Sequence, residues 1–186
     1  MRPVNRRVTS VTTIELASCR LRRWRAEDAG SLVRHANNPN VSRNLRDAFP
    51  YPYTELHAES FLERNVGREP ITNFAIEING EAAGSVSLRL QSDIYSGVAE
   101  IGYWIAEPYW GRGIASEAAR AMTDYGFEQF PITRIEADVF ERNPASMRVL
   151  EKAGFRFEAR LRQRITKAGE TMDAMLYAVT RSDWRD

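Results

Sequence analysis

The sequence of 186 residues contains one cysteine, Cys19, and two histidines. A single cysteine cannot form a disulfide within the chain, and one cysteine with two histidines supplies too few ligands for a structural zinc site. Basic and acidic side chains number 26 and 25, so the charge balance gives no reason to expect a nucleic-acid partner. No run of about 18 apolar residues occurs, as a membrane-spanning helix would require. We therefore expect a cytoplasmic protein without a metal site, a membrane segment or direct nucleic-acid contact.

The N-terminal residues 1–10 carry three arginines but no apolar segment of the kind that secretory signal peptides contain. We expect this stretch to form a flexible tail. Residues 11–186 show no linker, repeat or low-complexity segment, and a chain of this length buries about 70% of its unfolded surface when it folds as one unit. The sequence therefore predicts a single domain over residues 11–186.

The spacing of apolar residues predicts an α+β fold around a mixed sheet. The predicted strands cover residues 13–22, 74–78, 83–90, 98–105, 134–139, 155–164 and 172–180, and the predicted helices cover residues 26–37, 54–68, 116–129 and 143–153. Asn79 and Gly80 lie between two of these strands and are typical of a two-residue hairpin turn.

A glycine-containing loop links the predicted strand at 98–105 to the long helix. Gly111 and Gly113 remove side chains from the turn, so consecutive backbone N–H groups can surround an anion. The helix that follows adds its first N–H groups and the positive end of its dipole. Gly113 is followed by Ile114 and not by the lysine of a Walker loop, and the third glycine of a dinucleotide fingerprint is absent. The pattern indicates a cradle for a diphosphate-bearing cofactor, or else a plain strand-to-helix turn.

Asn143 and Ser146 begin the last predicted helix, and two interpretations of them are open. Asn is one of the best N-cap residues, and Ser three positions later is common in a first turn. A carboxamide at the end of a strand can also bind a polyamide ligand, and a hydroxyl group one turn into the helix can give up a proton.

Glu100 lies within an otherwise apolar predicted strand. Alternation places Glu100, Gly102 and Trp104 on one face and Tyr103 on the other. A carboxylate in such a strand needs a cation, water or a function. Glu100 is therefore a candidate general base, with a solvated or ion-paired position as the alternative.

These residues, in this order, resemble the GNAT superfamily of acyl-CoA-dependent N-acyltransferases. The motif of that family is Arg/Gln-x-x-Gly-x-Gly/Ala, and residues 110–115 read Trp-Gly-Arg-Gly-Ile-Ala. Gly113 and Ala115 match, whereas Trp110 departs from Arg/Gln. The stretch Glu-Ile-Gly-Tyr-Trp at 100–104 and the pair Asn143 and Ser146 are similar to the RimJ/RimL-type branch. The resemblance implies a single GNAT-like domain with a mixed, mostly antiparallel sheet of seven strands and about four helices.

The resemblance also implies acetyl-CoA as the co-substrate and direct transfer of its acetyl group to an amine. The residues implied to bind acetyl-CoA are Ile105, Gly111, Arg112, Gly113, Ile114, Ala115, Ser116 and Asn143. Many GNAT enzymes use a tyrosine as the general acid, but Leu150 occupies that position here. Ser146 is then implied to be the acid, with Glu100 or a water that it holds as the base.

The acceptor amine is open at this point. It is either the N-terminal α-amine of a protein, such as a ribosomal protein, or a small-molecule amine such as an antibiotic or a polyamine. Residues 45–70 are expected to shape the acceptor cleft, and the chain is expected to act as a monomer or homodimer. Two other classes of function are an acyl-CoA sensor without turnover and a nucleotide-binding regulatory module. The absence of Walker residues counts against the second of these.

Overall fold

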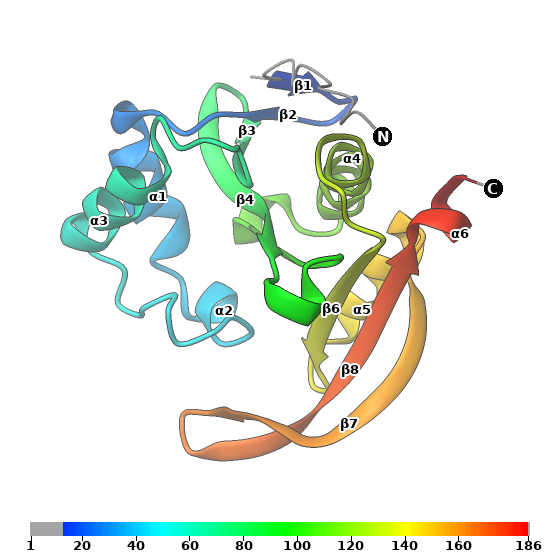
Figure 1. Cartoon of the computed structure of the whole chain (residues 1–186). Helices are drawn as coiled ribbons and strands as arrows, with labels where there is room; N and C mark the ends of the chain where they lie inside the picture. The colour runs from blue at the N-terminus through cyan, green and yellow to red at the C-terminus, as the bar shows by residue number, and fades with distance from the viewer. Residues whose placement is uncertain (1–12, 186) are drawn as a thin grey trace.

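The computed structural model describes residues 13–185, which form one sheet with helices on both faces (Figure 1). The strands are β1 (Thr13–Glu15), β2 (Arg20–Arg22), β3 (Asn73–Ile78), β4 (Glu81–Leu90), β5 (Val98–Ile105), β6 (Arg134–Phe140), β7 (Arg156–Lys167) and β8 (Glu170–Thr180). Their order across the sheet is β1-β2-β3-β4-β5-β6-β8-β7, and every neighbouring pair is antiparallel except β5 with β6. The α+β prediction is confirmed, and the predicted tail at 1–10 lies outside the described residues.

The predicted strand at 13–22 is wrong in one respect, because it consists of two strands, β1 and β2. The sheet therefore has eight strands and not seven. The chain reverses between them, where the backbone N–H groups of Ala17 and Ser18 donate to the carboxylate of Glu117 at 2.6 and 3.2 Å. Glu117 is 100 positions from Ala17, so the alternating pattern of residues 13–22 contains no sign of this turn.

The four predicted helices are present, and the structure adds two short ones. The α-helices are α1 (Ala29–Ala36), α2 (Pro39–Ser42), α3 (Glu55–Asn65), α4 (Ile114–Gln129), α5 (Pro144–Ala153) and α6 (Arg181–Arg185), and the 3₁₀ turns are η1 (Ala26–Asp28), η2 (Asp93–Tyr95) and η3 (Glu107–Tyr109). Among residues 13–185, the helices are all too short or too polar to cross a bilayer.

Two hydrophobic cores lie on opposite faces of the sheet. The larger core joins the sheet to α4 and α5 through buried side chains such as Met122, Ile135 and Leu150. The smaller core joins the other face to α1 and α3 through Leu32 and Leu62. Figure 1 shows these two helix pairs on either side of the sheet. The fold is thus a three-layer sandwich.

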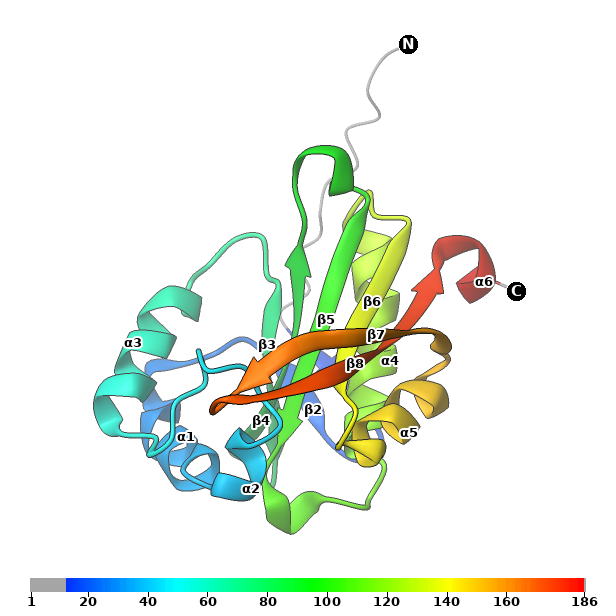
Figure 2. The same ribbon diagram turned by 90° about the horizontal axis from the view of Figure 1, so that it is seen from below.

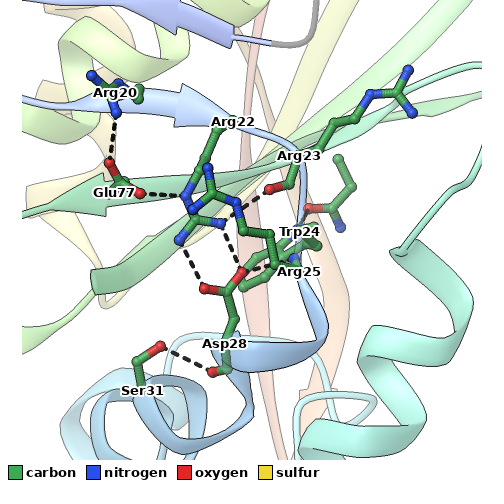
Figure 3. A network of polar contacts seen from close by, with 9 residues as sticks. Arg20, Arg22, Arg23, Trp24, Arg25, Asp28, Ser31 and Glu77 are labelled. Carbon is green, nitrogen blue, oxygen red and sulfur yellow. Dashed lines mark hydrogen bonds and ion pairs between the residues drawn. The ribbon is translucent and has the colours of Figure 1, made fainter. Parts of the chain in front are cut away.

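A buried ion network fastens α1 to the sheet (Figure 3). The guanidinium of Arg22, which is 2% exposed, donates to both oxygens of Asp28 at 2.7 Å and to Glu77 on β3. The hydrogen bonds to Asp28 raise the pKa of Arg22, so this side chain stays charged in the folded protein. The network joins β2, β3 and the turn before α1, and it holds the smaller core in place.

The sheet opens between its two parallel strands. β5 pairs with β6 over Val98–Glu100 alone, although β5 continues to Ile105. Ala106 donates its backbone N–H to β4 at 2.8 Å, so the even-numbered residues of β5 bond to β4. The odd-numbered residues Tyr103 and Ile105 therefore direct their backbone N–H and C=O groups toward the gap.

The β7–β8 hairpin forms the last two strands of the sheet, and its tip extends to the segment that follows α2 (Figure 2). Lys167 at its tip forms an ion pair with Asp47 at 2.6 Å. Arg142, which follows β6, donates to the backbone carbonyl of Arg43 at 2.6 Å and pairs with Glu170 of the hairpin at 2.9 Å. Segments about 120 positions apart thus meet on one side of the sheet.

Candidate active site

The glycine loop has the backbone that an anion cradle requires. Gly111 and Gly113 have φ angles of +75° and +81°, and a Cβ built at either position would meet no atom within 4 Å. The space in front of both glycines is therefore open. The 16-residue helix α4 begins at Ile114, so its N-terminal N–H groups belong to the same loop. The side chain of Arg112 folds back and donates to the carbonyl of Pro108 at 2.9 Å. The loop can thus offer backbone groups to a diphosphate.

The end of β5 beside this loop is arranged by a tryptophan. The indole Nε1 of Trp110 donates to the backbone carbonyl of Ile105 at 2.7 Å. This hydrogen bond occupies the Ile105 carbonyl, the last carbonyl that β5 directs toward the gap. The N–H of Ile105 and the N–H and C=O groups of Tyr103 remain directed there. Such a row of backbone groups can pair with an extended polyamide.

A cavity of about 630 Å³ lies next to the gap between β5 and β6. Of the site residues expected from the sequence, it brings together Glu100, Asn143 and Ser146. Ile105 and the loop 111–116 lie outside its lining. The candidate site thus has two parts: a backbone-rich part at the loop and the gap, and a cavity enclosed by side chains.

The Glu100 carboxylate is held by two arginines. Its Oε1 accepts from Arg46, in the segment after α2, and its Oε2 accepts from Arg89 on β4. The side chain remains 21% exposed at the cavity. The ion-paired alternative for Glu100 is therefore present in the structure, and any proton transfer at this position takes place beside two guanidinium groups.

Asn143 is the N-cap of α5, which is the first of the two interpretations of this residue. Its Oδ1 accepts the backbone N–H of Ser146 at 3.2 Å, so its Nδ2 is the group left for a ligand in the cavity. Ser146 lies in the first turn of the same helix, half-buried at the cavity wall. Leu150, one turn further on, is completely buried in the larger core. Ser146 thus brings a hydroxyl group from α5 to the cavity wall.

Tyr103 lies on the face of β5 that alternation predicts, but the sequence analysis did not select it as a site residue. Its phenol oxygen lies 2.8 Å from Ser146 Oγ and 3.2 Å from the Ser146 carbonyl oxygen, so its hydrogen can be donated to either. Burial raises the pKa of Tyr103, so the phenol keeps its proton at neutral pH. Alternation assigned Tyr103 to the face opposite Glu100. Both residues nevertheless line the cavity, because it extends into the gap beside β5.

The rest of the cavity has aromatic walls. Phe49 packs edge-on against Trp104 with the ring centroids 5.5 Å apart, and Tyr53 lies against Phe49. Phe61 of α3 adds a fourth ring to the lining. The prediction that residues 45–70 shape this cleft agrees with the lining, which includes residues 45–50 and four positions on α3.

Every carboxylate among the described residues that line the cavity has a basic partner from this chain. Asp47 pairs with Lys167 at 2.6 Å, and Asp138 pairs with Arg164 at 3.3 Å. The third, Glu100, is held by its two arginines. The three carboxylates are therefore all compensated by cations of this chain, and aromatic rings form much of the apolar wall.

The lone thiol lies elsewhere. Cys19 precedes β2 and packs against the larger core, and burial together with the nearby charge of Glu117 raises its pKa to about 12. The thiol is protonated at neutral pH and lies outside the cavity lining. A cysteine-bound acyl intermediate is therefore not a feature of this site.

Comparison with known proteins identifies the family. Residues 19–156 match the acetyltransferase (GNAT) domain family. The uncharacterised N-acetyltransferase p20 of Bacillus licheniformis is 26% identical over 170 residues, which cover 88% of this chain and 93% of p20. The spermidine N(1)-acetyltransferase of Escherichia coli is 26% identical over 159 residues, covering 85% and 83% of the two chains.

The fold has solved counterparts as well. The structure of RimL, a ribosomal L7/L12 α-N-protein acetyltransferase in complex with coenzyme A, superposes with a TM-score of 0.79. It is 21% identical and covers 90% of this chain and 97% of its own. The glycine loop, the open parallel strand pair and the family match lead to one conclusion: the chain belongs to the GNAT family of N-acetyltransferases.

Proposed function

We propose that this protein transfers the acetyl group of acetyl-CoA directly to the N-terminal α-amine of a protein or peptide. Acetyl-CoA supplies an activated thioester, and the residues of this chain bind it and move the protons. Family membership supports N-acetyl transfer. The choice of an α-amine rests on the charges of the cavity.

The observation that carries this choice is the pairing of all three cavity carboxylates among the described residues. A polyamine has three or four ammonium groups, and each loses hydration when it enters a cavity unless a carboxylate compensates. Asp47, Glu100 and Asp138 already have cationic partners from this chain. A single amine attached to an uncharged or aromatic body fits this surface better than a polyamine does.

The pKa of the acceptor amine is a second argument for an α-amine over a lysine side chain. An α-amine with a pKa near 8 is about 10% neutral at pH 7, whereas a lysine near 10.4 is about 0.04% neutral. The difference is worth roughly 3 kcal/mol of activation free energy. Both carboxylate oxygens of Glu100 already accept hydrogen bonds from arginines, which compete with an amine proton for them. An acceptor that is already partly neutral therefore suits this site.

Each residue of the site then has a proposed task. The backbone N–H groups of residues 111–116 bind the pyrophosphate, while the side chain of Arg112 is engaged with the Pro108 carbonyl. The Ile105 N–H and Asn143 Nδ2 bind the pantetheine arm, and a backbone N–H of β5 stabilises the oxyanion. The acceptor amine loses its proton through Glu100 or a water that Glu100 holds, and Ser146 protonates the departing thiolate.

The decisive experiment measures release of the CoA thiol with a panel of acceptors. It compares short peptides with a free N-terminus, the same peptides with a blocked N-terminus, spermidine and an aminoglycoside. We expect turnover only with the free peptides and a mass increase at their first residue. Ser146→Ala should lower kcat about 100-fold with those peptides.

Three results would contradict this proposal. Turnover of spermidine without turnover of peptides would assign the cavity to polyamines despite its paired carboxylates. Turnover of the aminoglycoside alone would assign it to another small-molecule amine. Binding of acetyl-CoA, seen as a rise in Tm, without turnover of any amine would indicate a sensor.

A further inference from the structure

The phenol of Tyr103 is a feature that the roles above do not use. It lies between β5 and α5, 2.8 Å from Ser146 Oγ and 3.2 Å from the Ser146 carbonyl oxygen. It joins the strand beside the gap to the first turn of the helix that carries the proposed acid. Both side chains line the cavity.

The hydrogens of these two hydroxyl groups can be arranged in two ways. In the first arrangement, the phenol donates to the Ser146 carbonyl and the serine hydroxyl donates to the phenol oxygen. The serine hydrogen is then turned away from the cavity. If the phenol donates to Oγ, the serine hydrogen is free to point into the cavity. Only the second arrangement leaves Ser146 able to protonate a thiolate.

Burial of Tyr103 favours a permanent donor. The pKa of the phenol is raised by desolvation, so its hydrogen is retained at any pH at which the enzyme would act. A hydrogen bond donated to Oγ also stabilises the negative charge that develops there as the serine proton leaves.

We propose that Tyr103 is a positioning residue that directs the hydroxyl hydrogen of Ser146 toward the sulfur of the departing CoA. In this step the Ser146 O–H bond breaks as an S–H bond forms. The serine oxygen regains a proton from the one that the acceptor amine releases, carried by water in the cavity. Tyr103 keeps its own hydrogen throughout. This inference rests on the proposed role of Ser146 as the acid.

A double-mutant cycle tests the proposal. Tyr103→Phe retains the ring and removes the hydroxyl, and it should lower kcat about tenfold, the size of one hydrogen bond, with KM for acetyl-CoA changed less than about twofold. Ser146→Ala should lower kcat about 100-fold. The double variant should be no slower than Ser146→Ala alone, because Tyr103 acts only through the serine.

Tyr125→Phe is the matched control. The Tyr125 hydroxyl is also buried and donates to the Ile71 carbonyl at 2.9 Å, but it lies on α4 outside the cavity lining. This variant should lower Tm by an amount similar to Tyr103→Phe and leave kcat unchanged. An equal loss of kcat in both variants would reduce Tyr103 to a structural residue.

The remaining outcomes separate the two claims. If the effects of Tyr103→Phe and Ser146→Ala multiply to about 1000-fold, Tyr103 acts independently and the positioning role is wrong. If Ser146→Ala loses 100-fold and Tyr103→Phe loses nothing, the positioning role is also wrong, while the acid role stands. If Ser146→Ala retains full kcat, it is the proposed acid that fails.

Discussion

The two parts of the candidate site are built from different material. The cofactor part consists of backbone: Gly111, Gly113, the start of α4, and the groups that β5 directs into the gap. The acceptor part is lined by side chains, many of them from the segment after α2 and from α3, and the tip of the β7–β8 hairpin contacts that segment through the Lys167–Asp47 ion pair. Backbone recognition needs a short local motif, whereas side-chain recognition needs the whole fold. This difference explains why the sequence indicates the co-substrate more clearly than the acceptor.

The largest effect is expected where α1 is attached to the sheet, on the acceptor side of the site. Asp28→Ala leaves the buried Arg22 charge without its two-oxygen partner, and we expect the free energy of unfolding to fall by about 3–5 kcal/mol. The acceptor wall should loosen while the cofactor part remains intact. Denaturant unfolding measures the first effect, and the acetyl-CoA-induced rise in Tm checks the second.

Arg20→Ala is the control for this change. Arg20 also pairs with Glu77, but its side chain is 45% exposed, so its loss should cost less than about 1 kcal/mol. A fall of similar size in both variants would show that burial of the network is unimportant. Loss of the acetyl-CoA effect in Asp28→Ala would show that the two parts of the site are not independent.

The second prediction concerns binding of acetyl-CoA to the cofactor part. At a concentration about 100 times its Kd, acetyl-CoA should stabilise the protein by about 2.7 kcal/mol. For a domain of this size that corresponds to a rise in Tm of roughly 5–10 °C. Gly113→Glu adds a negative side chain where the diphosphate is expected and should abolish this rise.

Gly113→Ala separates charge from backbone strain in that test. Any side chain at Gly113 is strained, because φ is +81° there. The alanine variant should lose stability but keep part of the acetyl-CoA effect. An unchanged rise in Gly113→Glu would remove the loop from the cofactor part.

The third test concerns the boundary between the two parts, at Glu100. Glu100→Gln keeps the size of the side chain and should lower the rate about tenfold near pH 6, where the acceptor amine is mostly protonated and needs a base. The loss should shrink toward pH 9, because the amine is then neutral. A pH profile of kcat/KM with a free-N-terminus peptide measures both limits.

Arg89→Gln serves as the control for Glu100. It removes one of the two cations but leaves the carboxylate in place, so its pH profile should keep the wild-type shape. A loss in Glu100→Gln that is equal at every pH would make this carboxylate an anchor for the two arginines and not a base.

The smallest effect is expected at the tip of the β7–β8 hairpin. Lys167→Met removes the ion pair with Asp47, and the free energy of unfolding should change by less than about 1 kcal/mol. The KM for the peptide acceptor should rise about two- to threefold, with the KM for acetyl-CoA unchanged. Arg156→Ala, which breaks a 3.9 Å pair at the opposite end of β7, should alter neither KM. A change in KM for acetyl-CoA alone would contradict the division.

The sequence predicted most of the fold because most of its elements depend on local patterns. The turn at Asn79 and Gly80 has positive φ at both residues, as its sequence indicated, and the helix at 143–153 ends at Gly154 with φ of +100°. The division of residues 13–22 into two strands was not predicted: a short turn with a Leu16 N–H to Cys19 carbonyl bond at 3.0 Å interrupts the alternation, and Glu117, about 100 positions away, binds the N–H groups of Ala17 and Ser18 within it. Local pattern is sufficient only where the partner is close in sequence.

The candidate site shows the same limit. Glu100 was selected as a carboxylate in an apolar strand and Ser146 through the family resemblance, but the partners of Glu100 lie 54 and 11 positions away, and Tyr103 lies 43 positions from Ser146. No feature of the sequence near Tyr103 distinguishes its hydroxyl from that of a core tyrosine. The signal that could have found it is its place on β5 opposite the start of α5, which needs the topology of the sheet.

The Arg22 network has a consequence for where this fold can exist. It connects segments 55 positions apart, as a disulfide does in many small proteins, but it uses charge and geometry instead of a covalent bond. Thiols, glutathione and oxidants leave such a cross-link unchanged, because none of its atoms changes oxidation state. Its strength is therefore independent of redox potential, and its contribution to the stability of the domain should be the same in a reducing or an oxidising compartment.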